Sequence, residues 1–464
     1  MAVFFAGKLI NIKGVQPVKT EVKKLTSSNI NDQAIVIGGS IAGLLSARVL
    51  ADRFASVTII ETDKLPDLPK ARIGVPQSVQ PHILFTKGYR ILGELFPNIE
   101  EQLRAGGAIA IDWTREFNHF SRRGWNATST SPSDLNSVSC SRPLLEWCIR
   151  QQLANYPNIH FVNEHRVTAL LSHSKTRITG VSLRSTTGDR QELPASLVVD
   201  ASGRRSHAPS WLQELGFTPP PETVINPFLG YATRRYKEPE DFKSNWKVML
   251  ISQSPPKGTR LGYLAKIEGG EWIATLGGYG CDFPPIDNQG FLDFARSLPS
   301  LEFYDAIKGA EPTSRIYAHR ATANRLRHYE KIKLPQGFIC LGDAVCALCP
   351  VYGQGMTVSA IAATILRDCL GDLNPARFQK KLAKSNSLSW MLATGSDLRF
   401  ATTQGGRRPV KSGGFFTSYT ERLLKLTNSD PKMNALLMEV AHLLKSPLAF
   451  YHPQIAFKVL TKKD

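Results

Sequence analysis

Near the start of the chain, the spacing of the hydrophobic residues changes from a continuous run to a helical repeat and back. Ala34–Ile37 is an apolar run with the length of a buried strand, and Ser56–Ile60 is a second one that ends at Glu61. Between these runs, apolar residues recur at helical spacing: Ile41, Leu44, Leu45 and Val49. Strand, helix and strand in this order predict a βαβ opening with parallel strands.

Turn residues and helix caps divide the next part of the chain. A proline-rich loop over residues 65–82 precedes a predicted helix that ends near Phe96. Ser141 is a favourable helix N-cap, with Pro143 in the first turn of the helix that follows it. Several strands are expected between residues 159 and 199.

Aromatic-rich runs separated by turns fill residues 223–285 and predict an antiparallel sheet, which would be a second, substrate-facing layer. The expected strands are Phe228–Tyr236, Trp246–Gln253, Arg260–Ile267 and Glu271–Tyr279. Four aromatic residues of these runs are candidates either for the core or for the lining of an apolar pocket: Trp246, Tyr263, Trp272 and Tyr279.

The C-terminal part is predicted to be mostly helical. A helix is expected over Met356–Leu366, and more helices from about Pro375 onward. Asp430 would cap a helix that begins at Pro431 and is stopped by Pro447. Its apolar residues form one stripe: Met433, Leu436, Leu437, Val440 and Leu444.

Composition restricts the protein class. No stretch of about 20 apolar residues is uninterrupted, so no membrane span is predicted. Residues 1–32 lack a convincing secretory signal and are interpreted as a mobile basic leader, with a transit peptide as the alternative. The seven cysteines suggest reduced thiols and a cytoplasmic protein. Cys346 and Cys349 have redox-motif spacing but no partner pair at zinc spacing, so no metal site is expected.

The net charge of +18 is compatible with nucleic acid, an anionic membrane, an acidic ligand or a solvated surface. The basic residues are scattered, so specific nucleic-acid binding is not expected. Peripheral membrane contact through the C-terminal helices is left open, because Phe450, Tyr451 and Phe457 lie near basic residues such as Lys458.

A glycine-rich turn joins the first strand to the first helix. Its sequence is Gly38-Gly39-Ser40-Ile41-Ala42-Gly43. In such turns the first glycine permits the bend, the middle one lets the backbone approach a pyrophosphate, and the third permits close helix–sheet packing. Ser40 occupies the middle slot, where it is small enough to fit and can hydrogen-bond a phosphate. The helix N-terminus would add amide donors for the anion.

Glu61 lies close to the position expected for a ribose-binding acid, at the end of the second strand. A carboxylate there accepts hydrogen bonds from ribose hydroxyls and repels a 2′-phosphate. The opening segment therefore predicts a site for FAD or NAD rather than NADP.

Two later motifs extend this site. Leu197–Ser206 runs from a strand into a tight turn that contains Asp200 and Gly203. Farther on, Gly342 and Asp343 are followed by the segment Pro350-Val351-Tyr352-Gly353-Gln354-Gly355-Met356-Thr357. An aspartate there can meet ribityl hydroxyls, and the glycines bring backbone amides close to a bound ring, where they would stabilise negative charge.

In order and spacing, the three motifs resemble those of single-component FAD-dependent monooxygenases of the para-hydroxybenzoate hydroxylase fold, over roughly residues 33–375. Three stretches are most similar to the bacterial polyether epoxidase branch and, more distantly, to squalene epoxidase: residues 72–77 with His82, residues 199–204 and residues 350–357.

This resemblance implies an α/β fold with a Rossmann-like FAD-binding domain, an interleaved antiparallel-sheet substrate domain and a helical C-terminal region. The FAD-binding domain would comprise residues 33–222, interrupted by substrate-domain segments near 65–140, and residues 316–374. The substrate domain would comprise residues 223–315, and the helical region residues 375–464.

The resemblance also implies the cofactor contacts. The first motif would hold the pyrophosphate, Glu61 the adenosine ribose, and Asp343 the ribityl–pyrophosphate region. The expected FAD-binding residues are Gly38, Gly39, Ser40, Ala42, Gly43, Glu61, Arg142, Asp200, Gly203, Gly342, Asp343, Pro350, Gly353, Gln354, Gly355 and Met356.

The expected activity is insertion of one oxygen atom from O₂ into a small apolar substrate through a flavin hydroperoxide, with NADH or NADPH as electron donor. Alkene epoxidation or hydroxylation in secondary metabolism fits best. Epoxidation needs no activated side-chain nucleophile, and His82 is the one weak candidate for proton handling.

Three alternatives stay open. A flavin-dependent halogenase would share the scaffold, but no tryptophan pair forms the Trp-x-Trp segment of that group, and Lys70 lacks the expected context. A polyprenyl reductase of the same superfamily is the second alternative. A flavin-bearing protein that binds tRNA or a membrane is the third. The substrate and the oligomeric state cannot be inferred from the sequence.

Overall fold

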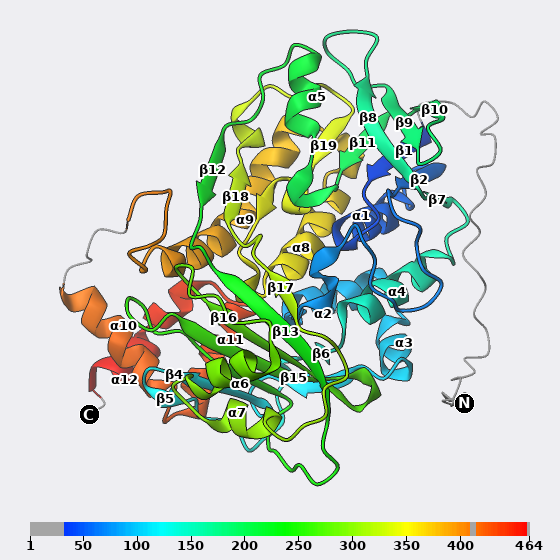
Figure 1. Cartoon of the computed structure of the whole chain (residues 1–464). Helices are drawn as coiled ribbons and strands as arrows, with labels where there is room; N and C mark the ends of the chain where they lie inside the picture. Colours follow the sequence, from blue (N-terminus) through cyan, green and yellow to red (C-terminus); the bar gives the residue numbers. More distant parts are fainter. Residues whose placement is uncertain (1–31, 409–413, 462–464) are drawn as a thin grey trace, which may run out of the picture.

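The chain folds into two large β-sheets with helices around them (Figure 1). The computed structural model describes residues 32–408 and 414–461. The expected basic leader lies outside the described residues except for Asp32. Six of the seven cysteines are buried, and Cys281 is exposed.

The first sheet is parallel, with strand order β19-β11-β1-β2-β7. Its strands are β1 (Gln33–Ile37), β2 (Ser56–Ile60), β7 (Ile159–Val162), β11 (Leu197–Asp200) and β19 (Phe338–Cys340). The βαβ opening predicted from the sequence is confirmed, since β1 and β2 pair in parallel from Gln33 with Ser56 to Ile37 with Ile60. The sheet therefore joins the beginning, the middle and a late part of the chain.

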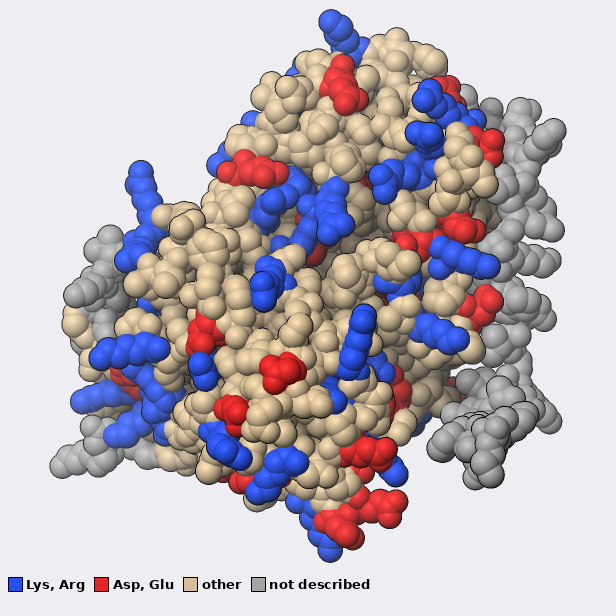
Figure 2. Space-filling view, viewed as in Figure 1, with Lys and Arg blue, Asp and Glu red and all other residues tan. Residues whose placement is uncertain are grey.

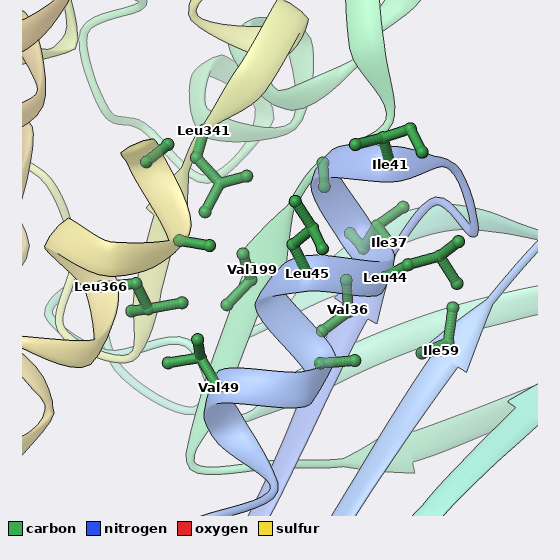
Figure 3. Packing of buried hydrophobic residues seen from close by; sticks show 14 of the residues in the cluster. Val36, Ile37, Ile41, Leu44, Leu45, Val49, Ile59, Val199, Leu341 and Leu366 are labelled. Carbon is green, nitrogen blue, oxygen red and sulfur yellow. The ribbon is translucent and has the colours of Figure 1, made fainter. Parts of the chain in front are cut away.

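Helices cover the parallel sheet and carry its core. They are α1 (Ile41–Leu50), α2 (Thr86–Leu95), α3 (Ile99–Ala105), α4 (Arg142–Leu153), α5 (Ala208–Glu214) and α8 (Gly355–Arg367). Helices α1 and α8 pack side by side, and Leu44 and Val49 of α1 point toward strand and α8 residues such as Val36 and Leu366 (Figure 3). These side chains are fully buried, and each contributes about 1.5–3 kcal/mol of hydrophobic stabilisation.

The second sheet has seven strands in the order β17-β13-β16-β15-β14-β4-β5. They are β4 (Phe117–Ser121), β5 (Gly124–Trp125), β13 (Gly230–Lys237), β14 (Val248–Ile251), β15 (Arg260–Ile267), β16 (Glu271–Gly278) and β17 (Tyr317–His319). The four predicted strands are present, and their mutual pairings are antiparallel. Strands β4, β5 and β17 join them from outside residues 223–315, and β4 pairs with β14 in parallel.

Helices α6 (Asn288–Arg296) and α7 (Glu302–Ile307) pack against the second sheet and bury a separate apolar cluster. Trp246 and Trp272 belong to this cluster, together with Phe291 and Phe303. These two tryptophans are therefore core residues. Tyr279, by contrast, belongs to a smaller cluster that includes Val351 and Tyr352 of the predicted flavin-facing segment.

Three small sheets complete the strand content of the described residues. They are β8 (His165–Leu171) with β9 (Gly180–Ser185) and β10 (Arg190–Pro194); β12 (Glu222–Ile225) with β18 (Asn324–Arg327) and β20 (Cys346–Ala347); and β3 (Ile109–Asp112) with β6 (Asn136–Ser139). The middle one places β20 directly before the segment that begins at Pro350.

The C-terminal region is helical, as predicted, with α9 (Pro375–Asp397), α10 (Gly414–Leu426), α11 (Pro431–Ala441) and α12 (Pro453–Thr461). Asp430 caps α11 by accepting hydrogen bonds from the backbone N–H groups of Lys432 and Met433. The predicted end of this helix is wrong. Leu443 adopts a left-handed backbone conformation with φ of 60°, which ends the helical path before Leu444 and Pro447. None of the described helices is long and apolar enough to cross a membrane.

Candidate cofactor-binding site

The glycine turn after β1 is shaped by steric limits that only glycine satisfies. Gly38 has φ of +104°, and a Cβ atom there would lie 2.7 Å from the carbonyl oxygen of Ala201. A Cβ atom on Gly43 would lie 1.8 Å from the carbonyl oxygen of Gly38. Side chains at either position would therefore push the start of α1 away from the sheet edge.

Ser40 is at the N-cap position of α1, but its hydroxyl is turned to other partners. Ser40 Oγ donates to Glu146 Oε2 at 3.0 Å and accepts from Arg142 Nη2 at 2.7 Å. No side chain caps the first turn of α1, and this turn contains no acidic residue. Its free amide N–H groups and the positive end of the helix dipole together favour an anion.

A buried ion-pair cluster lies against this turn. Arg72 Nε pairs with Glu146 Oε1 and Arg72 Nη1 with Asp63 Oδ2, both at 2.9 Å, and Arg72 Nη2 donates to the Gly39 carbonyl oxygen at 3.2 Å. Arg142 Nη2 approaches Glu146 Oε2 to 3.2 Å. Burial alone would raise the pKa of Glu146, but the two guanidinium groups hold it below its usual value. Glu146 thus fixes both arginines beside the glycine turn.

Glu61 already has a full set of hydrogen-bond donors. Its Oε2 accepts from Gly39 N at 2.9 Å and lies 3.0 Å from Arg72 Nη1, while Oε1 accepts from Thr62 N, Thr62 Oγ1 and Asp63 N. A carboxylate offers about four acceptor positions. A ribose hydroxyl would therefore replace one of these donors, and Arg72 and Thr62 Oγ1 are the two that belong to side chains.

A narrow hollow opens beside this cluster, and its lining is strongly basic. The lining residues are Lys70, Arg72, Val75, Ser78, Arg142, Pro143, Glu146 and Arg150. Three buried polar atoms in this wall have no hydrogen-bond partner: Ser78 Oγ, Arg142 Nε and Arg150 Nε. Unpaired buried donors beside excess positive charge are what phosphate oxygens would satisfy.

The third predicted motif, Gly342–Asp343, is placed next to the first by direct contact. Gly342 has φ of +62°, and a Cβ atom there would lie 2.7 Å from Ala42 Cβ on α1. The Gly342–Asp343 turn therefore touches the start of α1. Asp343 lies 3.7 Å from Arg204 Nε, and 40% of its side chain remains accessible. Desolvation by the surrounding protein raises the pKa of this carboxyl.

The second motif, with Asp200 and Gly203, lies next to the Gly342–Asp343 turn, because the Asp200 carbonyl oxygen accepts from Leu341 N at 3.0 Å. Asp200 is fully buried and accepts hydrogen bonds from Ser202 N, Ser202 Oγ and Ser206 Oγ, so its contacts are internal. Gly203 has φ of +82° and open space around its missing side chain. The structure thus shows a turn-supporting role for Asp200, while a direct contact of Asp200 with a cofactor stays a prediction.

The segment that was predicted to face the flavin forms a short turn before α8. This flavin-facing turn comprises residues 349–353. Pro350 is exposed, Gly353 adopts φ of +65°, and the Gly353–Gly355 stretch leads into the helix. Gln354 Oε1 is buried without a hydrogen-bond partner, and the first turn of α8 has no acidic residue. Met356 is buried beside them. A second uncapped helix N-terminus therefore lies beside that of α1.

His82 is held as an uncharged side chain. Its Nδ1–H donates to the Gln80 carbonyl oxygen at 2.9 Å, which leaves Nε2 as an acceptor. Desolvation by burial, and then the charge of Arg142, lower the pKa of His82 to about 3. At neutral pH this imidazole carries no proton to donate from Nε2, and its role in proton handling stays a prediction.

Several site residues were missed by the sequence reasoning. Glu146 lies four residues after Arg142, so an ion pair on one helix face was readable from the spacing. Arg72 lay in a motif stretch without an assigned role. Arg204 likewise lay in a motif stretch, residues 199–204, without an assigned role. Arg150 gave no local signal, because its partner, the Pro66 carbonyl oxygen, comes from a distant part of the chain. No group of three or more His, Cys, Asp or Glu residues in residues 32–408 and 414–461 could hold a metal ion.

Comparisons with solved structures show the same fold at low sequence identity. The flavin-dependent brominase Bmp2 superposes with a TM-score of 0.62 and 14% identity, covering 93% of this chain and 98% of the brominase. The p-nitrophenol 4-monooxygenase PnpA from Pseudomonas putida superposes with a TM-score of 0.63 and 14% identity, covering 89% and 98%. The mixed α/β fold predicted from the sequence is therefore confirmed as that of FAD-dependent monooxygenases and halogenases.

Comparison at the sequence level gives a relative across almost the whole chain. No family model matches the sequence. Protein Rv3254 of Mycobacterium tuberculosis is 30% identical over 436 residues, which are 90% of this chain and 91% of that protein. The chain therefore belongs to the same family as Rv3254, built on the fold of the FAD-dependent monooxygenases and halogenases.

Proposed function

We propose that this chain is an FAD-dependent monooxygenase that uses NADH or NADPH and O₂ to insert one oxygen atom into a small apolar organic substrate. One observation carries the proposal: the glycine turn and the Gly342–Asp343 turn touch, beside a basic hollow with unpaired buried donors. When bound, FAD supplies hydride acceptance and oxygen activation.

The residues at the first end of the site would bind the FAD diphosphate. Gly38 and Gly43 leave room for the backbone to approach it, and the α1 amides point toward the same place. Arg142 and Arg72 would neutralise its charge, with Glu146 holding both guanidinium groups in position. Arg142 Nε, which lacks a partner, would gain a phosphate oxygen.

The residues at the second end would bind the ribityl chain and the ring. The accessible carboxylate of Asp343 is suited to accept hydrogen bonds from ribityl hydroxyls. The backbone around Gly353 and the uncapped N-terminus of α8 would place amide dipoles near the ring, where they stabilise negative charge.

An apolar cluster next to the flavin-facing turn supports an apolar substrate. Tyr231, Leu261 and Tyr279 of the second sheet pack with Val351 and Tyr352 of this turn. Hydroxylation of a phenol would need a base to remove its proton, and His82, with a pKa of about 3, is poorly suited to that task. We therefore favour epoxidation of an alkene, in line with the resemblance to the epoxidase branch.

Halogenation is the second candidate, because flavin-dependent halogenases are among the structural neighbours. The geometry of Lys70 does not favour it. Lys70 is exposed and lies in the wall of the basic hollow with Arg150, rather than in the apolar cluster that contacts the flavin-facing turn.

The decisive experiment reconstitutes the purified chain with FAD and screens alkenes, phenols and indoles for stimulation of NADH or NADPH oxidation. The incorporation of labelled oxygen into products formed under ¹⁸O₂ is then measured by mass spectrometry. A monooxygenase adds one labelled oxygen atom, whereas a halogenase or a reductase adds none. A chain that cannot be loaded with FAD would refute the proposal, and a halogenated product would replace it with the second candidate.

A further inference from the structure

A fully buried carboxylate lies behind the predicted flavin-facing turn. Asp397 is the last residue of α9, and none of its surface is accessible to solvent. Within the part of the chain that the structure describes, no lysine, arginine or histidine forms an ion pair with it. The carboxylate is therefore balanced only by neutral hydrogen-bond donors.

Two donors connect Asp397 to the flavin-facing turn. Tyr352 Oη donates to Asp397 Oδ1 at 2.5 Å, and Asn324 Nδ2 donates to Asp397 Oδ2 at 2.6 Å. Asn324 Oδ1 in turn accepts from the backbone N–H of Cys349 at 2.7 Å. Both ends of the segment 349–352 are thus tied to one carboxylate, at its start through Asn324 and at its end through Tyr352.

The same network reaches the residues that follow β14 and β16 of the second sheet. The hydroxyl of Tyr279 lies 3.3 Å from that of Tyr352, and Gln253 Nε2 lies 3.4 Å from Tyr279 Oη. The Tyr279 ring stacks on Phe400, three residues past Asp397, at a centroid distance of 4.3 Å. The flavin-facing turn, the second sheet and the end of α9 therefore meet at this point.

We propose that Asp397 is a positioning residue of the cofactor site, whose carboxylate fixes the turn 349–353 against the flavin ring through Tyr352 and Asn324. This inference rests on the proposed FAD binding. A neutral residue could fill the same space. Because a buried carboxylate without a cation is costly, we look for its role in the hydrogen bonds that it accepts. Charge-assisted hydrogen bonds hold the turn more firmly than neutral ones would.

Protonation of Asp397 should loosen the turn. Burial raises the pKa of Asp397 to about 6, against the effect of the hydrogen bonds that it accepts. The titratable groups around it are Tyr352, Tyr279, Tyr231 and Cys349, and burial raises the pKa of each, so all four stay protonated below pH 8. Among these groups, Asp397 alone changes its charge between pH 5 and 8.

The test measures FAD dissociation constants, by quenching of flavin fluorescence, from pH 5 to pH 8. We expect the wild-type chain to bind FAD more tightly above pH 6 than below. Asp397→Asn and Tyr352→Phe should each weaken binding about tenfold at pH 8 and flatten this pH dependence. The double variant should lose less than the sum of the two single losses, because the charge that Asp397→Asn removes acts in part through the Tyr352 hydrogen bond.

A charge-swap variant separates loss of this contact from misfolding. In the double variant Asn324→Asp, Asp397→Asn, residue 397 still accepts from Tyr352, and residue 324 still accepts from Cys349 N. We expect this variant to recover FAD affinity to within about threefold of wild type, since the hydrogen-bond pattern is kept. Control variants are Tyr236→Phe, which removes a buried hydroxyl elsewhere in the sheet, and Asp112→Asn, which changes a hydrogen-bonded acid at the end of β3.

Each outcome decides the inference. Wild-type affinity and pH dependence in Asp397→Asn and Tyr352→Phe would overturn the role of Asp397 and leave the proposed function standing. Additive losses in the double variant would also overturn it. A wild-type chain that binds no FAD at any pH would overturn both, and the flavin fluorescence of that sample shows this before any variant is compared.

Discussion

At the scale of single residues, two buried acids of the site differ in the groups that surround their carboxylates. Glu146 is held between the guanidinium groups of Arg72 and Arg142, whereas Asp397 has only neutral donors. Paired acids stabilise the folded chain most when they are ionised, and an unpaired buried acid stabilises it most when it is protonated. The two kinds of acid therefore respond to pH with opposite signs.

Asp397 should make the folded chain less stable as the pH rises. Its pKa is raised from 3.8 to about 6, so its contribution is fully present below pH 4 and is lost as the pH rises through 6. Two pKa units correspond to about 3 kcal/mol. Urea unfolding of wild type and Asp397→Asn at pH 4, 5.5 and 7.5 measures this. The difference in unfolding free energy should move by that amount in favour of the variant, and a difference independent of pH would contradict it.

Removal of the buried Arg72 charge should be costly, because three carboxylates share it. Arg72→Gln leaves Glu61, Asp63 and Glu146 close together without their common cation, which should lower the unfolding free energy by about 3–5 kcal/mol at pH 7. Urea unfolding checks the value. The loss should shrink as the pH falls, because Glu146, whose pKa Arg72 helps to hold down, can then take up a proton in the variant.

The matched control for Arg72 is an exposed pair. Arg90 Nη2 lies 3.0 Å from Asp134 Oδ2, and both side chains are largely accessible. Arg90→Gln should cost less than about 1 kcal/mol, because water screens such pairs. Equal losses for the two arginine variants would mean that the buried cluster does not hold the glycine turn.

The sequence located those parts of the site that are built from local geometry. Gly38 and Gly43 could be identified because a tight turn before a helix demands glycine at fixed spacing. Asp397 could not, because its partners Tyr352 and Asn324 lie far away in the sequence and meet it only through the tertiary fold. Long-range contacts of this kind leave no periodic or spacing signal.

At the scale of elements, helix α2 packs closely against α8 at one of its glycines. Gly88 faces α8, where a Cβ atom would lie 2.7 Å from Thr357 Oγ1 and 3.0 Å from Thr357 Cα. Gly93, on the same helix, has nothing within 4 Å of such an atom. One glycine therefore permits close helix packing, and the other only weakens the helix.

Alanine at these two positions should change stability in opposite directions. Gly88→Ala should cost about 1–3 kcal/mol, since the backbone of α8 must move. Gly93→Ala should stabilise the chain by about 0.5–1 kcal/mol, because alanine has the higher helix propensity. Urea unfolding of both variants gives the two values, and equal signs would show that α2 does not pack on α8 through Gly88.

Element boundaries were less predictable than the elements themselves. The start of α11 is encoded locally by the Asp430 side chain, and this prediction is confirmed. The end depends on the left-handed backbone of Leu443, which no sequence pattern indicated. The apolar stripe of α11 is mostly buried, with Met433, Leu436 and Val440 packed inside the molecule.

At the scale of the whole molecule, the chain passes repeatedly between the two large sheets. Strands β1 and β2 belong to the parallel sheet, β4 and β5 to the seven-stranded sheet, and later segments alternate again until β19 returns to the first. We expect a single cooperative unfolding transition, because neither sheet is a continuous stretch of chain. Tryptophan fluorescence and far-UV circular dichroism should give coincident urea transitions, and two separate midpoints would contradict this.

The tail is where membrane contact should be tested. Four apolar side chains are exposed near the C-terminal end of the described chain: Leu448, Tyr451, Phe457 and Leu460. Lysine and arginine side chains gather in the same region of the surface, over α10 and α12 (Figure 2). Membrane contact through this tail would make the chain sediment with anionic liposomes and would leave the double variant Phe457→Ser, Leu460→Ser in the supernatant. Equal soluble fractions would rule out this contact.

The single exposed cysteine makes the native chain a ready substrate for site-specific labelling. Cys281 is the only accessible thiol among the seven, and it follows Tyr279 by two residues. A maleimide dye should therefore attach at one position per folded molecule and at seven after denaturation. Attached there, an environment-sensitive dye would report movements just after the end of β16, close to Tyr279 and the flavin-facing turn, without any engineered mutation.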